Sequence, residues 1–323
     1  MADAEAERYL HLVDPELRDA ALLMRATYAE LIPMNRRKLV KRRAAQAAMT
    51  RAPLEQPAYT EHRAKRADGG EVGVFAINAR PGANGAGILH IHGGGFTAST
   101  AIASMPGLQA LALELGCPIV TIDYRLAPET TWEGSLEDNY AGMQWMLANA
   151  SAIGVDPARI AVLGESAGGG HAALLTLAMR ERGDPPLAFQ ALIYPMIDDR
   201  SGTSRQMAGH LGYYAWPPDM NRFGWHSFLG RKPGGRNVPV AAVPARVADL
   251  SGLPPAFIGV GGLDIFVEED IDYARRLNAA GVPTELLVVP GAFHGFDMFM
   301  PGAAVSQRFT AAKVAALGRG LGL

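Results

Sequence analysis

Residues 160–171 read Ile-Ala-Val-Leu-Gly-Glu-Ser-Ala-Gly-Gly-Gly-His, a short apolar run followed by a glycine-rich segment around a serine. The four apolar residues 160–163 predict a short strand buried on both faces. The Ala- and Leu-rich segment 172–179 has the composition of a helix. A sharp turn must join them, and glycines at both ends of Gly164-Glu-Ser-Ala-Gly168 let it pass close to its neighbours. The pattern predicts a nucleophile elbow around Ser166, although a glycine-rich turn with an incidental serine would read the same.

Composition narrows the class of protein. The chain has 323 residues, of which 49% are hydrophobic and 19% charged, as expected for a soluble globular enzyme with a large core. The net charge of −2 gives no reason to expect nucleic acid or anionic membranes as partners. The single cysteine, Cys117, excludes an intrachain disulfide and any multi-cysteine metal site.

The N-terminal residues and the lengths of the apolar runs predict a cytoplasmic location. Residues 1–8 are acidic and lack the basic and apolar regions of a signal peptide, and no apolar run is long enough to cross a bilayer. The basic cluster within residues 36–43 could bind nucleic acid or a membrane surface. The balanced total charge and the lack of interleaved aromatics favour a solvated helix face instead.

The order of predicted elements indicates the α/β class. Helices are expected within 15–50, and a hairpin turn at Asp68-Gly69-Gly70 joins the first two strands. Strands are predicted at 59–66, 71–79, 87–92, 117–122, 159–163, 189–194, 256–260 and 285–289, and later helices at 133–151, 268–280 and 304–317. An antiparallel start followed by alternating strands and helices predicts a mostly parallel sheet flanked by helices.

One long segment interrupts this alternation. Residues 200–243 carry several aromatic residues between two strands, which is typical of a lid or cap. The expected organisation is therefore N-terminal cap helices in 1–55, a catalytic domain in 56–199 and 244–323, and a cap insertion in 200–243.

A serine nucleophile needs a base to accept its proton and an acid to hold that base. In sheets with such an elbow, the acid and then the histidine follow the serine on loops after later strands. His294 lies directly after the last predicted strand, where the base is expected. His171 sits in the helix after Ser166, from which its side chain cannot reach back to the serine hydroxyl. His210 and His226 fall in the aromatic insertion.

Asp264 ends the strand before that of His294 and is the predicted acid. Its competitors fall at the start of the next helix, where acidic side chains stabilise the first turn. They are Glu268, Glu269, Asp270 and Asp272.

A tetrahedral intermediate needs N–H donors. His92-Gly-Gly-Gly95 matches a glycine motif that supplies them, and the N–H of Ala167 adds a further donor. A phosphate cradle is the alternative, but no Gly-Lys-Ser/Thr follows. His90 and His92 could seed a metal site, yet no third ligand is apparent, so neither a metal nor a cofactor is expected.

These motifs occur in the order of a known family. His92-Gly-Gly-Gly-Phe96, Asp123-Tyr-Arg-Leu-Ala-Pro-Glu129, Gly164-Glu-Ser-Ala-Gly-Gly169 and the loops of Asp264 and His294 resemble those of the hormone-sensitive-lipase-like α/β-hydrolases, the bacterial family IV esterases. The resemblance covers roughly residues 55–320. It implies an eight-stranded α/β-hydrolase sheet with a helical cap, and by family analogy a homodimer through the edge of the last strand.

The resemblance also implies site residues. They are Ser166, Asp264 and His294 as a triad, with Gly94, Gly95 and Ala167 as oxyanion donors. Two departures stand out: Asp264-Ile-Phe replaces the usual Asp-Pro-Leu, and Glu165 replaces Asp or Thr before the nucleophile.

We therefore expect a cofactor-free carboxylic ester hydrolase that acts on a small-molecule ester of short to medium acyl chain. Phe96, Phe223 and Trp225 are predicted to contact the substrate, although Phe223 and Trp225, which lie in the insertion, could equally be cap core. An amidase, peptidase or lactonase with the same triad is the second reading. A non-catalytic small-molecule receptor on the same fold is the third, which the presence of His294 disfavours.

Overall fold

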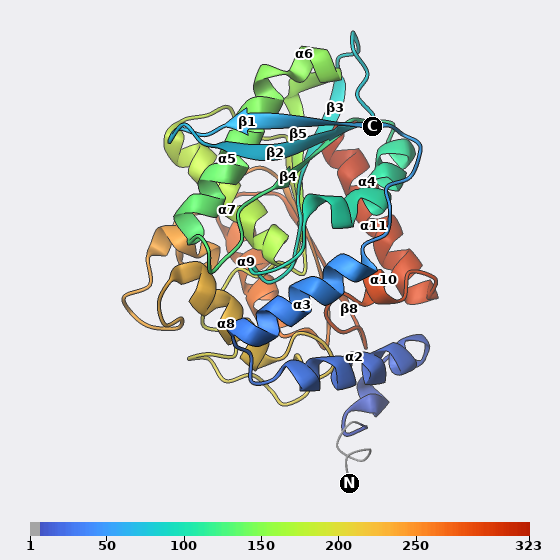
Figure 1. Ribbon diagram of the computed structural model, residues 1–323, viewed down its shortest axis with the longest axis vertical. Coiled ribbons are helices and arrows are strands. Elements are labelled where there is room, and N and C mark those ends of the chain that lie inside the picture. The colour runs from blue at the N-terminus through green and yellow to red at the C-terminus, as the bar shows by residue number, and fades with distance from the viewer. Residues whose placement is uncertain (1–6) are drawn as a thin grey trace.

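An eight-stranded sheet runs through the middle of the molecule in the order β1-β2-β4-β3-β5-β6-β7-β8 (Figure 1). The computed structural model describes residues 7–323, so most of the N-terminal stretch used to judge a signal peptide lies outside the described residues. Strand β2 is antiparallel to β1 and β4, and every other neighbouring pair is parallel. The strands are β1 (Tyr59–Lys65), β2 (Glu71–Ile77), β3 (Gly85–Ile91), β4 (Ile119–Asp123), β5 (Val155–Glu165), β6 (Phe189–Ile193), β7 (Ala256–Gly261) and β8 (Thr284–Val289). The predicted sheet is confirmed.

Helices cover both faces of the sheet because the central strands are apolar on both sides. In β5, Ala161 and Leu163 join one core cluster, whereas Ile160 and Val162 join the other. The first cluster packs under α4 (Ala101–Glu114), α10 (Phe296–Phe299) and α11 (Ala304–Leu321). The second packs under α5 (Trp132–Ala148), α6 (Ala150–Ile153), α7 (Ala167–Arg182) and α9 (Val267–Ala279).

Helix α4 was not among the helices expected from the sequence. Its interior contains Pro106 followed by Gly107, two residues that disfavour helix and hide its pattern. Thr100 caps its first turn, since the side-chain oxygen accepts from the N–H of Ala103 at 3.3 Å.

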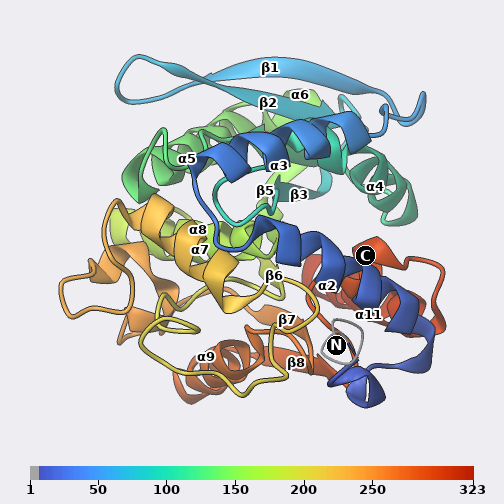
Figure 2. The ribbon, with the colours of Figure 1, turned by 60° about the horizontal axis from the view of Figure 1, so that its bottom comes forward.

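Two segments that are distant in sequence form a cap beside the carboxyl ends of the strands. Helices α2 (Arg18–Leu31) and α3 (Arg36–Met49) lie together with α8 (Pro218–Leu229) in front of the sheet (Figure 2). The N–H of Met34 donates to the Asp219 carboxylate at 2.7 Å and so links the two segments. Short 3-10 helices complete the described elements: η1 (Leu10–Leu12), η2 (Pro15–Leu17), η3 (Val240–Ala242) and η4 (Pro244–Arg246).

The basic cluster of α3 is only partly a solvated face. Arg36, Arg37 and Lys41 are exposed, but Arg42 is 8% exposed. Arg43 is half-buried and forms two 2.8 Å hydrogen bonds with the Glu129 carboxylate. The expectation of a solvated face was wrong for these two arginines, because the catalytic domain packs against the side of α3 that carries them.

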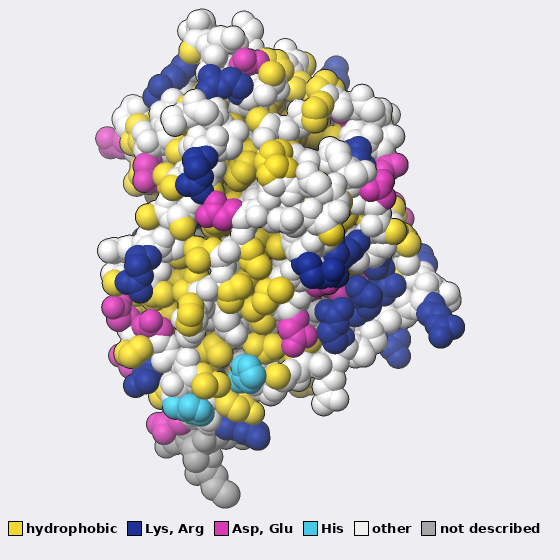
Figure 3. Space-filling view, turned by 180° about the vertical axis from the view of Figure 1, so that it is seen from behind, with side chains coloured by type: hydrophobic (Ala, Val, Ile, Leu, Met, Phe, Trp, Pro, Cys, Tyr) yellow, Lys and Arg dark blue, Asp and Glu magenta, His cyan; other side chains and the backbone are white. Residues whose placement is uncertain are grey.

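The outer surface gives two further observations. Among residues 7–323, no helix combines the length and apolarity that crossing a membrane requires. Seen from behind, the molecule carries apolar side chains across the middle of its face, with charged side chains around them (Figure 3).

Candidate active site

Ser166 stands on the turn between β5 and α7. Its backbone angles, φ 56° and ψ −121°, lie outside the regions that L-residues prefer. A Cβ on Gly164 would lie 2.2 Å from the carbonyl oxygen of Gly168, and one on Gly168 would lie 2.0 Å from that of Ile91. The predicted close approach at both glycines is therefore confirmed, and the turn holds the serine above the sheet.

Ser166, His294 and Asp264 come together at the carboxyl ends of β5, β8 and β7. The Ser166 hydroxyl oxygen lies 2.9 Å from Nε2 of His294, and Nδ1 of His294 lies 2.7 Å from Oδ2 of Asp264. The other Asp264 oxygen accepts from the N–H of Phe266 at 3.0 Å, which fixes the carboxylate. This arrangement lets the imidazole take a proton from the hydroxyl while the carboxylate holds the ring.

Residues 92–97, which we call the glycine loop, follow β3 and pass against the elbow. A Cβ on Gly93 would lie 3.4 Å from Cβ of Ser166. Gly94 and Gly95 have φ of +117° and +63°, values that favour glycine. Within residues 7–323, the backbone N–H groups of Gly94, Gly95 and Ala167 have no hydrogen-bond acceptor, so they are available to a bound oxygen.

Three aromatic rings surround the imidazole of His294. The ring centroids of Tyr194, Phe266 and Trp216 lie 4.9, 5.2 and 6.2 Å from that of His294. A Cβ on Gly95 would lie 2.0 Å from the Trp216 ring, so this indole also covers the glycine loop. Trp216 is one of the aromatic residues of 200–243 and was not among the predicted site residues, since spacing alone does not show which ring turns inward.

The three predicted substrate contacts lie in the glycine loop, which carries Phe96, and on α8, which carries Phe223 and Trp225. Phe96 and Trp225 are 1% and 0% exposed, with ring centroids 5.1 Å apart, and both pack on Phe228. Phe223 is half-buried on α8. Phe96 and Trp225 thus belong to a buried cluster that joins the glycine loop to α8, and a direct role for any of the three in substrate binding stays a prediction.

A polar group supports the elbow from below. The His90 ring bridges the Thr121 hydroxyl, at 2.8 Å, and the Glu165 carboxylate, at 2.9 Å. Burial alone would raise the pKa of Glu165, but the adjacent His90 ring outweighs it and lowers that pKa, so the carboxylate is ionised. Sequence reasoning left Glu165 without a role, because its partner lies on another strand.

The remaining histidines of the motifs are structural in their contacts. Nδ1 of His92 lies 2.8 Å from the Gly93 carbonyl, and its ring stacks on Tyr124, whose hydroxyl donates back to the His92 carbonyl at 2.9 Å. Burial lowers the pKa of His92 to about 4 and that of His171 to about 3. Among the described residues, no cluster of three or more His, Cys, Asp or Glu could hold a metal.

Two acids after Asp264 do more than begin a helix. Glu269 and Asp270 lie in the first turn of α9, as expected, but they are also buried, with exposures of 2% and 0%. Glu269 accepts from the N–H groups of Ile197 and Asp198 at 2.8 and 3.0 Å, and so ties α9 to the segment after β6. A place in the first turn of a helix therefore does not by itself explain why these two carboxyl groups are buried.

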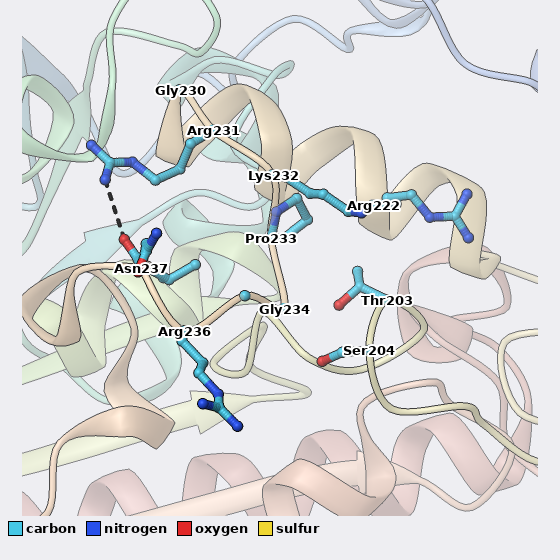
Figure 4. A pocket seen from close by; sticks show the side chains of 12 residues that line it. Thr203, Ser204, Arg222, Gly230, Arg231, Lys232, Pro233, Gly234, Arg236 and Asn237 are labelled. Atoms are coloured by element: carbon cyan, nitrogen blue, oxygen red, sulfur yellow. Dashed lines mark hydrogen bonds between the residues drawn. The ribbon is translucent and has the colours of Figure 1, made fainter.

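A surface cavity of about 730 Å³ opens on the cap, away from the triad. Its lining includes Arg222, Arg231, Lys232 and Arg236 but none of the three triad residues. The charged ends of the arginines point in different directions (Figure 4). The cavity therefore presents no converging set of donors.

The chain is similar to known esterases. A family profile described as the alpha/beta hydrolase fold matches residues 88–298. Carboxylesterase NlhH of Mycobacterium tuberculosis is 35% identical over 242 residues, 72% of this chain and 73% of that protein. A solved structure of a bacterial heroin esterase is 36% identical, with a TM-score of 0.84 over 97% of this chain and 99% of that one.

A solved structure of esterase LipW from Mycobacterium marinum is 30% identical, with a TM-score of 0.75 over 96% of each chain. The family profile covers β4 to β8, most of β3, the elbow and the loops of Asp264 and His294. The chain therefore belongs to the α/β-hydrolase fold family, in the hormone-sensitive-lipase-like branch that its motifs predict.

Proposed function

We propose that this chain is a serine-dependent carboxylesterase that hydrolyses small esters of short to medium acyl chain through an acyl-enzyme on Ser166. The observation that carries the proposal is the hydrogen-bonded series Ser166–His294–Asp264, with distances of 2.9 and 2.7 Å. The similarity to proteins named carboxylesterase and esterase supports the same activity.

The chemistry follows from the geometry. The Ser166 oxygen attacks the ester carbonyl carbon while Nε2 of His294 takes the hydroxyl proton, and Asp264 stabilises the resulting imidazolium. The N–H groups of Gly94, Gly95 and Ala167 bind the oxyanion. His294 then gives its proton to the departing alkoxide, which leaves as the alcohol.

Water completes the cycle with the same groups. His294 takes a proton from a water molecule, whose oxygen attacks the acyl carbonyl carbon and releases the acid from Ser166. No step in this scheme requires a cofactor. Trp216 covers the glycine loop beside His294 and limits the space for the acyl chain, which favours short to medium esters.

Hydrolysis of p-nitrophenyl acetate, butyrate, octanoate and laurate tests the proposal. We expect the highest kcat/KM on the shorter esters and a loss of about 10⁴-fold or more in Ser166→Ala. The matched control is Ser151→Ala, an exposed serine that should retain full activity. If the wild-type protein hydrolyses no ester but does hydrolyse anilides or lactones, the ester proposal is contradicted and the same triad acts on another acyl group.

The location of the protein is also a proposal. We propose a cytoplasmic location, and cell fractionation with an antibody to the native protein tests it. Recovery in the culture medium or the membrane fraction would contradict it.

A further inference from the structure

Arg42 is a buried cation in the cap, next to the glycine loop. One of its terminal nitrogens, Nη1, lies 3.4 Å from the carbonyl oxygen of Gly94 and 3.3 Å from the Thr97 hydroxyl. Its guanidinium carbon lies 5.2 Å from the centroid of the Trp216 ring. The side chain thus touches both the loop that follows β3 and the indole that covers this loop.

No carboxylate forms an ion pair with Arg42 in the described part of the chain, whereas the adjacent Arg43 pairs with Glu129. Burial lowers the pKa of Arg42, but an arginine remains charged at neutral pH. A buried charge needs compensation, and here it comes from a carbonyl, a hydroxyl and a ring face. The positive charge is therefore only partly compensated in the resting site.

The Gly94 carbonyl has a fixed relation to the N–H of Gly95. Both belong to one planar trans peptide, in which the C=O and N–H bonds point in opposite directions. Gly94 is held toward Arg42 by its carbonyl oxygen, while Gly93 of the same loop passes against Ser166. The same carbonyl also accepts from the N–H of Thr97 at 3.3 Å. Because glycine populates many backbone angles, the Arg42 contact is a second restraint on the orientation of this peptide.

We propose that Arg42 is a positioning residue for the oxyanion site: it holds the Gly94 carbonyl so that the Gly95 N–H faces the reacting oxygen, and its charge favours the negative charge that forms there. The inference rests on the proposed ester hydrolysis. It makes the cap helix α3 a part of the catalytic arrangement, in addition to being a wall of the site.

If Arg42 positions the oxyanion site, its removal should weaken binding of the transition state and leave binding of the substrate nearly unchanged. Loss of one oxyanion donor lowers turnover by about 10²–10³-fold, so misplacing one through Arg42→Met should lower kcat by about 10–100-fold. KM should change by less than about threefold, because the ground-state carbonyl carries little charge. Affinity for an alkyl trifluoromethyl ketone, which forms an anionic adduct with the serine, should fall by the same factor as kcat.

Matched variants complete the experiment. Lys41→Met removes an exposed charge from the same helix and should leave kcat, KM and the ketone affinity unchanged. Arg42→Lys should recover part of the lost kcat, since it restores the charge and one donor. If Arg42→Met does not fold, Arg42→Gln replaces it, with the same direction of change expected.

Two outcomes would overturn the inference. One is a folded neutral variant with wild-type kcat and ketone affinity. The other is a rise in KM with unchanged kcat, which would assign Arg42 to uniform substrate binding. Both are distinct from failure of the proposed function, in which the wild-type protein itself would not hydrolyse esters.

Discussion

At the scale of single residues, the site depends on side chains and backbone conformations that are unfavourable in isolation. The backbone of Ser166 carries strain of about 1–3 kcal/mol. Hydrogen bonds offset it, since the Ser166 N–H donates to Ile193 at 2.8 Å and its carbonyl accepts from Met196 at 2.9 Å. Strain of this kind is retained where it exposes a reactive hydroxyl.

Asp270 is a second unfavourable feature, because its carboxyl group is buried without a hydrogen-bond partner among the described residues. It is fully buried, and among residues 7–323 neither of its oxygens has a hydrogen-bond partner. Burial first, and then the charges of Glu269 and Asp264, raise its pKa well above 3.8. Its contribution to stability is therefore full below the unfolded pKa and is lost as the pH rises through the folded pKa.

Asp270→Asn keeps the shape of the protonated acid and removes this titration. We expect its free energy of unfolding, relative to wild type, to rise between about pH 4 and pH 8, by about 1.4 kcal/mol for each pH unit that separates the unfolded from the folded pKa of Asp270. Urea denaturation at both pH values measures this. The half-exposed Asp272→Asn is the control, and an equal effect of Asp270→Asn at both pH values would contradict the prediction.

At the scale of elements, the elbow works because β3, β5 and α7 approach one another more closely than side chains allow. A Cβ on Gly168 would meet the backbone of Ile91 and His92 at 2.0 and 2.7 Å. Backbone atoms in the middle of a sheet cannot move away as the end of a flexible side chain can. The close packing of β3, β5 and α7 against one another therefore requires glycine at both positions of the elbow.

Gly168→Ala should accordingly destabilise the protein by about 2–4 kcal/mol. Gly107→Ala is the matched control, because a Cβ there meets nothing within 4 Å in the interior of α4. That change should be neutral or stabilise by up to about 1 kcal/mol. Midpoints of urea denaturation distinguish the two, and equal midpoints would show that the elbow can relax around an extra methyl group.

At the scale of the whole molecule, the site is assembled from loops that only the folded sheet brings together. The nucleophile, acid and base come from loops after β5, β7 and β8, and we propose that the N-terminal helices and residues 200–243 form one cap beside them. The free side of β8 forms one edge of this sheet. An unpaired strand edge can pair with another chain.

A homodimer through β8 is our proposal for the assembly. Leu286 on β8 is 37% exposed and Ile271 on α9 is 42% exposed, so apolar surface accompanies the open edge. Light scattering should give the mass of two chains for the wild type, and Leu286→Lys should shift it to one chain without loss of the fold. A wild-type monomer at all concentrations tested would contradict the proposal.

The sequence by itself determined the sheet, the elbow and the identity of the three residues that meet there. Buried strands read as short apolar runs, tight turns require glycine, and the acid and base follow the nucleophile in a set chain order. These constraints are local, or they depend only on the order of elements. That is why Ser166, Asp264 and His294 could be named before their distances were known.

Only the tertiary structure decided which side chains from distant segments complete the site. Trp216, rather than Phe223 or Trp225, lies beside His294, and Arg42 is buried against the glycine loop. A helical pattern shows which residues share a face, but the burial of that face depends on what packs against it. For the cap, that partner lies across the chain, and no local spacing encodes it.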